Sequence, residues 1–200
     1  MKFTTRKLAV IGMLGGISIM LEFGGLGIIQ LPFLPVQVTI MHIPTIIGAI
    51  VEGPIVGLFI GLIFGGFSMY RAFTQPSILS VAFMNPMVSI LPRLAIALTS
   101  YYSFQAIKKL SKGNSQKRIA LGTMVASAIG TLTNTIGVLG MAYLLYKDLL
   151  AKMFNVEPSM VGKAVIYGVA IPNGVPEAIA AVLIITPIIQ ALRKLYKSDF

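Results

Sequence analysis

The sequence predicts an all-α membrane protein that crosses the bilayer six times, with both termini in the cytoplasm. Three observations predict this fold class. Hydrophobic residues make up 56% of the 200 residues and charged residues only 11%, whereas soluble proteins carry about 25% charged residues. The mean hydropathy is +0.88. Basic residues stand at the ends of the apolar segments, which is typical of membrane topology.

Six apolar segments are predicted to be helices within a single transmembrane domain over residues 1–200, because a span needs about 20 apolar residues. Their approximate bounds are 6–23, 39–51, 54–69, 85–108, 118–146 and 165–196. The sequence Glu52-Gly53-Pro54 is read as a turn between two short helices, because proline lacks an N–H donor and restricts the residue before it. Residues 24–39 and 71–84 are expected to form loops.

The distribution of charge favours six spans over five. With six spans and both termini inside, eleven basic residues lie on the cytoplasmic side and five outside. Five spans would turn the basic cluster at 108–118 outward, which reverses the usual bias of Lys and Arg toward the cytoplasm. Topology therefore explains the net charge of +10, and we expect no nucleic-acid partner.

The residue inventory excludes several classes of chemistry. The chain has no Cys and one His, so we expect neither a disulfide framework nor a metal site built from several histidines. A phosphate-binding GxxxxGK[ST] motif and an HExxH motif are both missing from the sequence. We expect no enzymatic activity, no metal and no cofactor.

Polar residues at membrane depth are costly and therefore mark candidate functional sites. Most of those in this chain fall in the outer half of the predicted helices, where they predict a pocket open to the outside. Gln37 and Arg71 belong to the loops that would cap it, and Asn173 closely precedes Glu177. The predicted substrate-binding residues are Glu22, Gln37, His42, Arg71, Asn85, Arg93, Asn134, Asn173 and Glu177.

Each of these residues also has a purely structural interpretation. Arg93 is suited to an ion pair with Glu177 or Glu22, because buried charges usually need partners. His42 is suited to the membrane interface. Asn134 is suited to a hydrogen bond between helices, and Asn85 to capping one.

Two series of glycines predict close helix packing, since small residues four apart let helix backbones approach each other in lipid. Gly57, Gly61 and Gly65 favour packing inside the bundle. For Gly12 and Gly16 on the first helix, internal packing and contact with another protein are both open.

Three stretches resemble one family when taken in order: residues 5–16, the segment from His42-Ile43-Pro44 to Gly66, and the segment Asn85 to Arg93. In these stretches the chain resembles the substrate-binding (S) component of an energy-coupling factor (ECF) vitamin transporter. The family's first helix carries an Ala-x-x-x-Ala motif, which would fall on Gly12 and Gly16 here. Glycine therefore replaces alanine in this chain, and both are small.

The resemblance implies a multi-pass protein of the cell membrane that captures a vitamin at the outer face with high affinity. It implies docking on a transmembrane coupling (T) component and two cytoplasmic ATPases, through the small-residue face of Ala9, Gly12 and Gly16. The partners in the coupling module would drive release of the substrate inward.

The substrate is predicted less directly. The His-Ile-Pro and Asn-Pro-Met-Val-Ser-Ile-Leu-Pro-Arg segments look more like the pantothenate-type members than the riboflavin or thiamine ones, and Arg93 or Arg71 would pair with the carboxylate. Riboflavin, pyridoxine, cobalamin and niacin stay open as substrates. Outside the family, a self-sufficient secondary transporter and a membrane scaffold without a ligand also stay open.

Overall fold

A computed structural model describes residues 4–30, 37–75, 80–111 and 114–196, apart from the side chains of Gln30, Gln37 and Tyr196. The described chain is predominantly helical, as predicted, with one pair of short antiparallel strands. In chain order the elements are α1 (Thr5–Phe23), β1 (Ile28–Gln30), β2 (Gln37–Thr39), α2 (Ile43–Glu52), α3 (Pro54–Thr74), α4 (Ser80–Phe83), α5 (Pro86–Ser89), α6 (Leu91–Leu110), α7 (Ser115–Leu145), α8 (Lys147–Phe154), α9 (Val161–Val165), the π-helix η1 (Ile166–Ala170) and α10 (Ile171–Tyr196).

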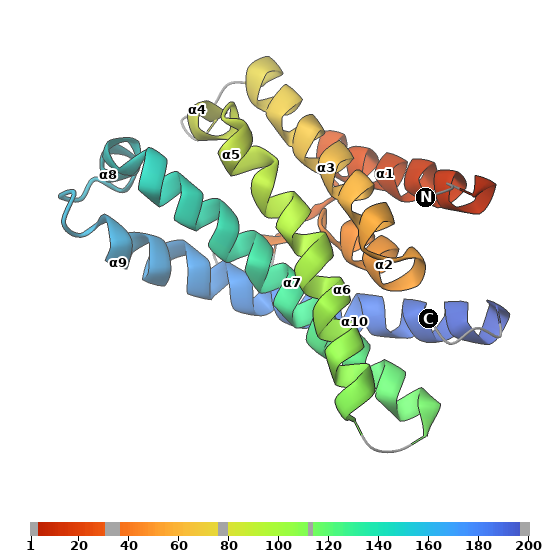
Figure 1. Cartoon of the computed structure of the whole chain (residues 1–200). Helices are drawn as coiled ribbons and strands as arrows, with labels where there is room; N and C mark the ends of the chain where they lie inside the picture. The colour runs from red at the N-terminus through yellow and green to blue at the C-terminus, as the bar shows by residue number, and fades with distance from the viewer. Residues whose placement is uncertain (1–3, 31–36, 76–79, 112–113, 197–200) are drawn as a thin grey trace.

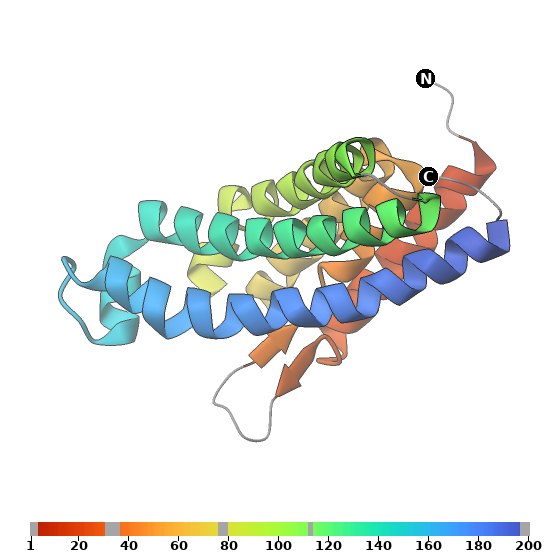
Figure 2. The same cartoon turned by 90° about the horizontal axis from the view of Figure 1, so that it is seen from below.

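The helices form an elongated bundle whose two ends differ in charge. The start of α1, the end of α6, the start of α7 and the end of α10 lie at one end, and α8 and the start of α9 lie at the other (Figures 1 and 2). The described basic residues of the first end are Arg6, Lys7, Lys108, Lys109, Lys117, Arg118, Arg193 and Lys194. We call this the basic end.

The packing follows from the apolar face of each helix. α6 lies along α7, α7 lies along α10, and α3 packs against α1, α2 and α6. The short helix α2 is central, because all its residues from Ile43 to Ile50 are buried. Its isoleucines pack with Ile96 and Phe104 of α6 and with the inner face of α10 in one apolar cluster.

Backbone chemistry sets the helix breaks. α2 ends at Gly53, whose φ of +98° favours glycine, and Pro54 starts α3. The region predicted as one helix from 85 to 108 is divided at Ile90 into α5 and α6. Pro92 has no N–H to donate to the carbonyl four residues earlier, and that carbonyl, on Val88, instead accepts a hydrogen bond from the Arg93 guanidinium.

The strand pair is a feature that the sequence analysis did not predict. Ile28 pairs with Thr39 and Gln30 with Gln37, so α2 begins at Ile43 rather than near residue 39. Figure 2 shows the two strands projecting beyond α10 from the middle of the bundle.

Three helical segments of the described chain are long and apolar enough to cross a membrane by length and composition. They are Pro54–Thr74, Ser115–Leu145 and Val161–Leu195. The last combines α9, η1 and α10 into one continuous helical segment.

Candidate functional site

A cavity of about 720 Å³ lies among α1, the strand pair, α3, α6, α7 and α10. This volume is within the range of small-molecule sites, roughly 300–1,000 Å³. Of the nine predicted substrate-binding residues, the cavity brings together six, which are Glu22, Arg71, Arg93, Asn134, Asn173 and Glu177. Glu22 and Arg71 are near the C-terminal ends of α1 and α3, so the cavity lies away from the basic end.

Arg93 is the most buried charge in the lining, with 5% of its surface exposed. Nη1 donates to Val88 O at 3.1 Å, which is the one hydrogen bond from the guanidinium to the described part of the chain. The guanidinium carbon lies 5.1 Å from the Phe64 ring centroid and 5.4 Å from that of Phe83. A guanidinium carries five N–H donors, so most of the donor capacity of Arg93 is unused.

Neither of the predicted carboxylate partners pairs with Arg93. Among the described residues, neither Glu22 nor Glu177 forms an ion pair with it within 4.0 Å. No direct ion pair of Arg93 is therefore present in this part of the chain, although Glu22 is close enough to interact with it electrostatically. Arg93 is a positive charge held at the cavity wall without an opposite charge in contact.

Glu177 is committed to the protein instead. Its Oε1 accepts from Thr39 N at 2.9 Å and from Thr39 Oγ1 at 2.7 Å, and Thr135 Oγ1 donates to Oε2 at 3.4 Å. Hydrogen bonds to a charged acceptor are among the stronger ones in proteins. Glu177 thus ties the second strand to α10 and α7 and fixes the strand pair as one wall of the cavity.

Arg71 is likewise committed. Its Nη1 donates to the backbone oxygen of Glu22 at 3.0 Å, and its Nε donates to Gln75 Oε1 at 3.1 Å. The first bond satisfies a carbonyl in the last turn of α1, which has no partner within the helix. Arg71 therefore joins the ends of α1 and α3 at the rim of the cavity.

The Glu22 carboxylate has unused capacity. Glu22 is 6% exposed, and its Oε2 has no hydrogen-bond partner among the described residues. The Ser68 hydroxyl lies beside the carboxylate from α3. Asn134 on α7 presents a second unpaired acceptor, because its Oδ1 has no partner in the described chain either.

Two other predicted residues, His42 and Asn85, are not in the cavity lining. His42 is 1% exposed, and its Nε2 lies 2.9 Å from Thr131 Oγ1. Since the Thr131 hydroxyl donates to Ser127 O, we assign the proton of that bond to His42 Nε2. Asn85 caps α5 by accepting from Met87 N and also donates to the Tyr146 hydroxyl at 3.2 Å. The side chain of Gln37 is outside the described residues.

Several lining residues were not singled out from the sequence, namely Ile28, Thr39, Met41, Phe64, Ser68, Ala72, Ser80, Phe83, Thr135, Val138, Leu139 and Val169. Phe64 and Ser68 were detectable in part, because they lie four residues apart beside the predicted inward face of Gly57, Gly61 and Gly65. Thr39 stood at the boundary between a predicted loop and a predicted helix, and the sequence analysis did not predict the strand in which it lies.

The π-helix η1 helps to position the α10 wall. Val169, Asn173 and Glu177 line the cavity at intervals of four residues, as a continuation of the buried positions Val161 and Val165. In a regular α-helix each such step drifts by about 40° around the axis. A π-helical turn contains more residues and reduces this drift, so the same face of the segment passes from the core to the cavity.

The predicted docking face of α1 is open. Ala9, Gly12 and Gly16 are exposed, and a Cβ atom built at either glycine would meet nothing within 4 Å. The opposite face of α1 is buried through Gly15, Ser18 and Glu22. One side of α1 therefore packs in the bundle and the other carries small residues with no contact in the described chain.

Comparisons with known proteins give two matches. Residues 6–189 match the family described as "ECF transporter, substrate-specific component". The chain is also 27% identical over 177 residues to the pantothenic acid transporter PanT of Lactococcus lactis subsp. cremoris (strain MG1363), an alignment that covers 82% of this chain and 81% of the relative.

Proposed function

The chain belongs to the family of substrate-specific components of ECF transporters, and on that premise we propose that it captures an anionic vitamin, with pantothenate as the best candidate. Capture takes place in the cavity that Arg93 lines. The similar transporter from Lactococcus lactis is named for pantothenic acid, which supports this choice among the vitamins. Pantothenate carries a carboxylate, two hydroxyls and an amide.

One observation carries the proposal, which is the buried Arg93 guanidinium at the cavity wall without a carboxylate partner. A buried charge without a partner is strongly unfavourable in proteins. A ligand carboxylate would supply the missing charge and accept bidentate hydrogen bonds. The guanidinium lies over the Phe64 and Phe83 rings, and these two cation–π contacts help to hold it in place.

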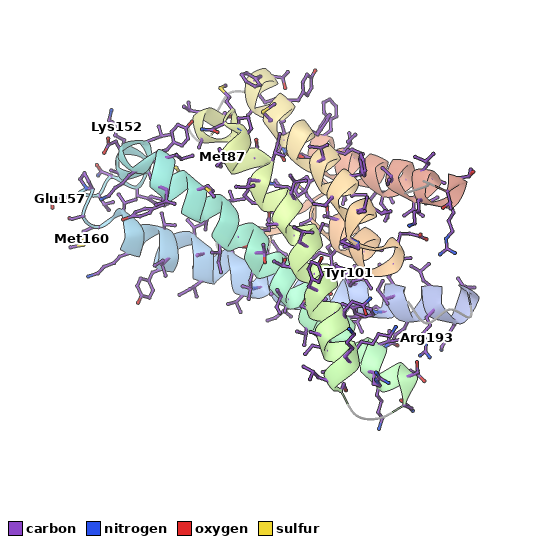
Figure 3. The ribbon with its side chains drawn as sticks, viewed as in Figure 1. Met87, Tyr101, Lys152, Glu157, Met160 and Arg193 are labelled. Carbon is purple, nitrogen blue, oxygen red and sulfur yellow. The ribbon has the colours of Figure 1, made fainter. Side chains whose placement is uncertain are left out.

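Calorimetry on the purified full chain tests this assignment. We expect pantothenate to bind to the unmodified protein, and Arg93→Met to weaken binding by about 2–5 kcal/mol, as expected for one partner of a buried charge pair. Lys152→Met is the matched control, because Lys152 is exposed at the α8 end, outside the lining (Figure 3). Equal affinities of the Arg93 variant and the control would remove Arg93 from the binding site.

We further propose that the chain forms a single six-helix domain in the cell membrane, with both termini in the cytoplasm. In this arrangement the segments α1, α2 and α6 accompany the three longer apolar segments. The basic end supports the orientation, because it combines the start of α1 and the end of α10 with the end of α6 and the start of α7, and carries eight described cations. Lys and Arg favour the cytoplasmic side of membrane proteins.

The open face of α1 is the proposed contact with the coupling component. Ala9, Gly12 and Gly16 would let a helix of a transmembrane T component approach closely. The T component would in turn sit on two cytoplasmic ATPases, whose ATP hydrolysis drives delivery of the vitamin inward. This division of labour is consistent with a chain that carries no nucleotide-binding motif of its own.

A further inference from the structure

Four charged side chains line the cavity, and they differ in how far the protein already uses them. Glu177 accepts three hydrogen bonds, and Arg71 donates to Glu22 O and to Gln75. Arg93 and Glu22 differ from these two, because the described chain leaves Arg93 Nε and Glu22 Oε2 without partners. Arg93 and Glu22 are therefore the two charges of the lining that carry a buried atom without a partner in the described chain.

The two free groups have opposite hydrogen-bonding character. A guanidinium can only donate hydrogen bonds, and an ionised carboxylate can only accept them. They come from different helices, α6 and α1, and are not in ion-pair contact with each other within the described chain. A ligand that satisfies both must therefore carry an acceptor at one end and hydrogen-bond donors at the other.

The side chains beside Arg93 and those beside Glu22 also differ in their capacity to accept hydrogen bonds. Arg93 lies against the Phe64 and Phe83 rings, which offer no hydrogen-bond acceptor of comparable strength. Glu22 lies beside the Ser68 hydroxyl, and Asn134 on α7 has an unpaired Oδ1. The lining thus carries one cationic donor group from α6, and groups that can accept hydrogen bonds from α1, α3 and α7.

We propose that Glu22 is a specificity-determining residue, which accepts hydrogen bonds from the hydroxyl groups of the ligand while the ligand carboxylate lies on Arg93. This inference rests on the proposed function and fixes the orientation of the ligand in the cavity. The carboxylate points toward α6 and the hydroxyl-bearing end toward α1 and α3. Anionic vitamins without donors at the far end are selected against, because they leave the buried Glu22 carboxylate without a partner.

A crossed comparison of two ligands and several variants tests the inference. The ligands are pantothenate and the analogue in which both hydroxyls are replaced by hydrogen, and calorimetry on the full chain measures their dissociation constants. The unmodified protein should prefer pantothenate by on the order of tenfold to a hundredfold, the range of a hydrogen bond to a charged group. In Glu22→Leu this preference should fall toward one, whereas in Arg93→Met both ligands should weaken and the preference should persist.

Glu157→Leu provides the matched control. It removes the same charge from an exposed position near α8, outside the cavity lining (Figure 3), and should leave the preference intact. Where Glu22→Leu does not fold, Glu22→Gln keeps the size of the side chain and should still reduce the preference several-fold.

The possible failures are distinguishable. An unmodified protein that binds neither ligand contradicts the proposed function and the inference together. Binding of pantothenate with a preference that is the same in the Glu22 variants as in the unmodified protein overturns the inference alone. A preference for pantothenate that disappears in the Arg93 variant and persists in the Glu22 variants would mean that the ligand lies in the opposite orientation, and this result also overturns the inference.

Discussion

Replacing Gly61 by alanine tests whether the glycine series on α3 allows the close approach of α6. A Cβ atom at Gly61 would lie 2.6 Å from the backbone oxygen of Arg93 and 3.1 Å from its carbonyl carbon. Ordinary van der Waals contact begins at 3.4 Å, so the helices would have to separate by about 0.8 Å. The obstacle is backbone, which cannot swing aside as a side chain can.

The magnitude follows from two opposing terms. Overpacking of a tight interior costs about 1–3 kcal/mol. Alanine in place of glycine in a helix recovers about 0.5–1 kcal/mol. The net loss of unfolding free energy is therefore about 0–2.5 kcal/mol, which lowers the Tm of a chain of this size by up to about 10 °C. Because the displaced atoms belong to Arg93, affinity for pantothenate should fall as well.

Thermal melts of the purified protein in one fixed detergent provide the assay. Gly12→Ala is the matched control, since a Cβ at Gly12 meets nothing within 4 Å and the same gain in helix propensity applies. We expect Gly12→Ala to melt at or above the temperature of the unmodified protein, and Gly61→Ala to melt below it. A Gly61→Ala protein that is as stable as the control would refute the packing argument.

Two further predictions address coupling and the strand pair. Replacing Gly12 and Gly16 together by leucine should abolish ATP-dependent uptake of pantothenate in cells that contain the coupling module. Pantothenate binding, measured by calorimetry, should be retained. The docking assignment is wrong if binding is lost and uptake persists. Replacing Glu177 by leucine removes the acceptor of both Thr39 hydrogen bonds, so the Thr39 amide should exchange with deuterium faster than in the unmodified protein. Glu177→Gln keeps an acceptor oxygen, so the Thr39 amide should exchange more slowly in this variant than in Glu177→Leu. Equal exchange in the two Glu177 variants would show that this tether does not hold the strand.

The sequence was informative about positions at which the cost of burying a polar side chain decides the structure. An ionised or amide side chain at membrane depth needs a polar environment, and that argument selected Glu22, Arg93, Asn134 and Glu177, which the structure places around one cavity. A separate argument predicted the turn at Glu52-Gly53-Pro54, because proline interrupts a helix regardless of tertiary contacts, and the structure gives Gly53 a positive φ there.

The partners of those side chains could not be read from the sequence. From the sequence, Glu22 and Glu177 were equally suitable as partners of Arg93. In the structure Glu177 instead accepts a hydrogen bond from Thr39, which lies in a strand 138 residues away in the sequence. His42 is turned toward Thr131, and that contact depends on how α2 lies against α7. Helical periodicity carries no information about such contacts between distant segments, and it also missed a three-residue strand.

Mass spectrometry of small molecules that co-purify with the full chain from cells grown with a vitamin mixture tests the central claim most directly. The account predicts pantothenate, in near-stoichiometric amount, in the unmodified protein and its loss from Arg93→Met. Retention of a cationic or uncharged vitamin in place of pantothenate, unaffected by the Arg93 substitution, would contradict it.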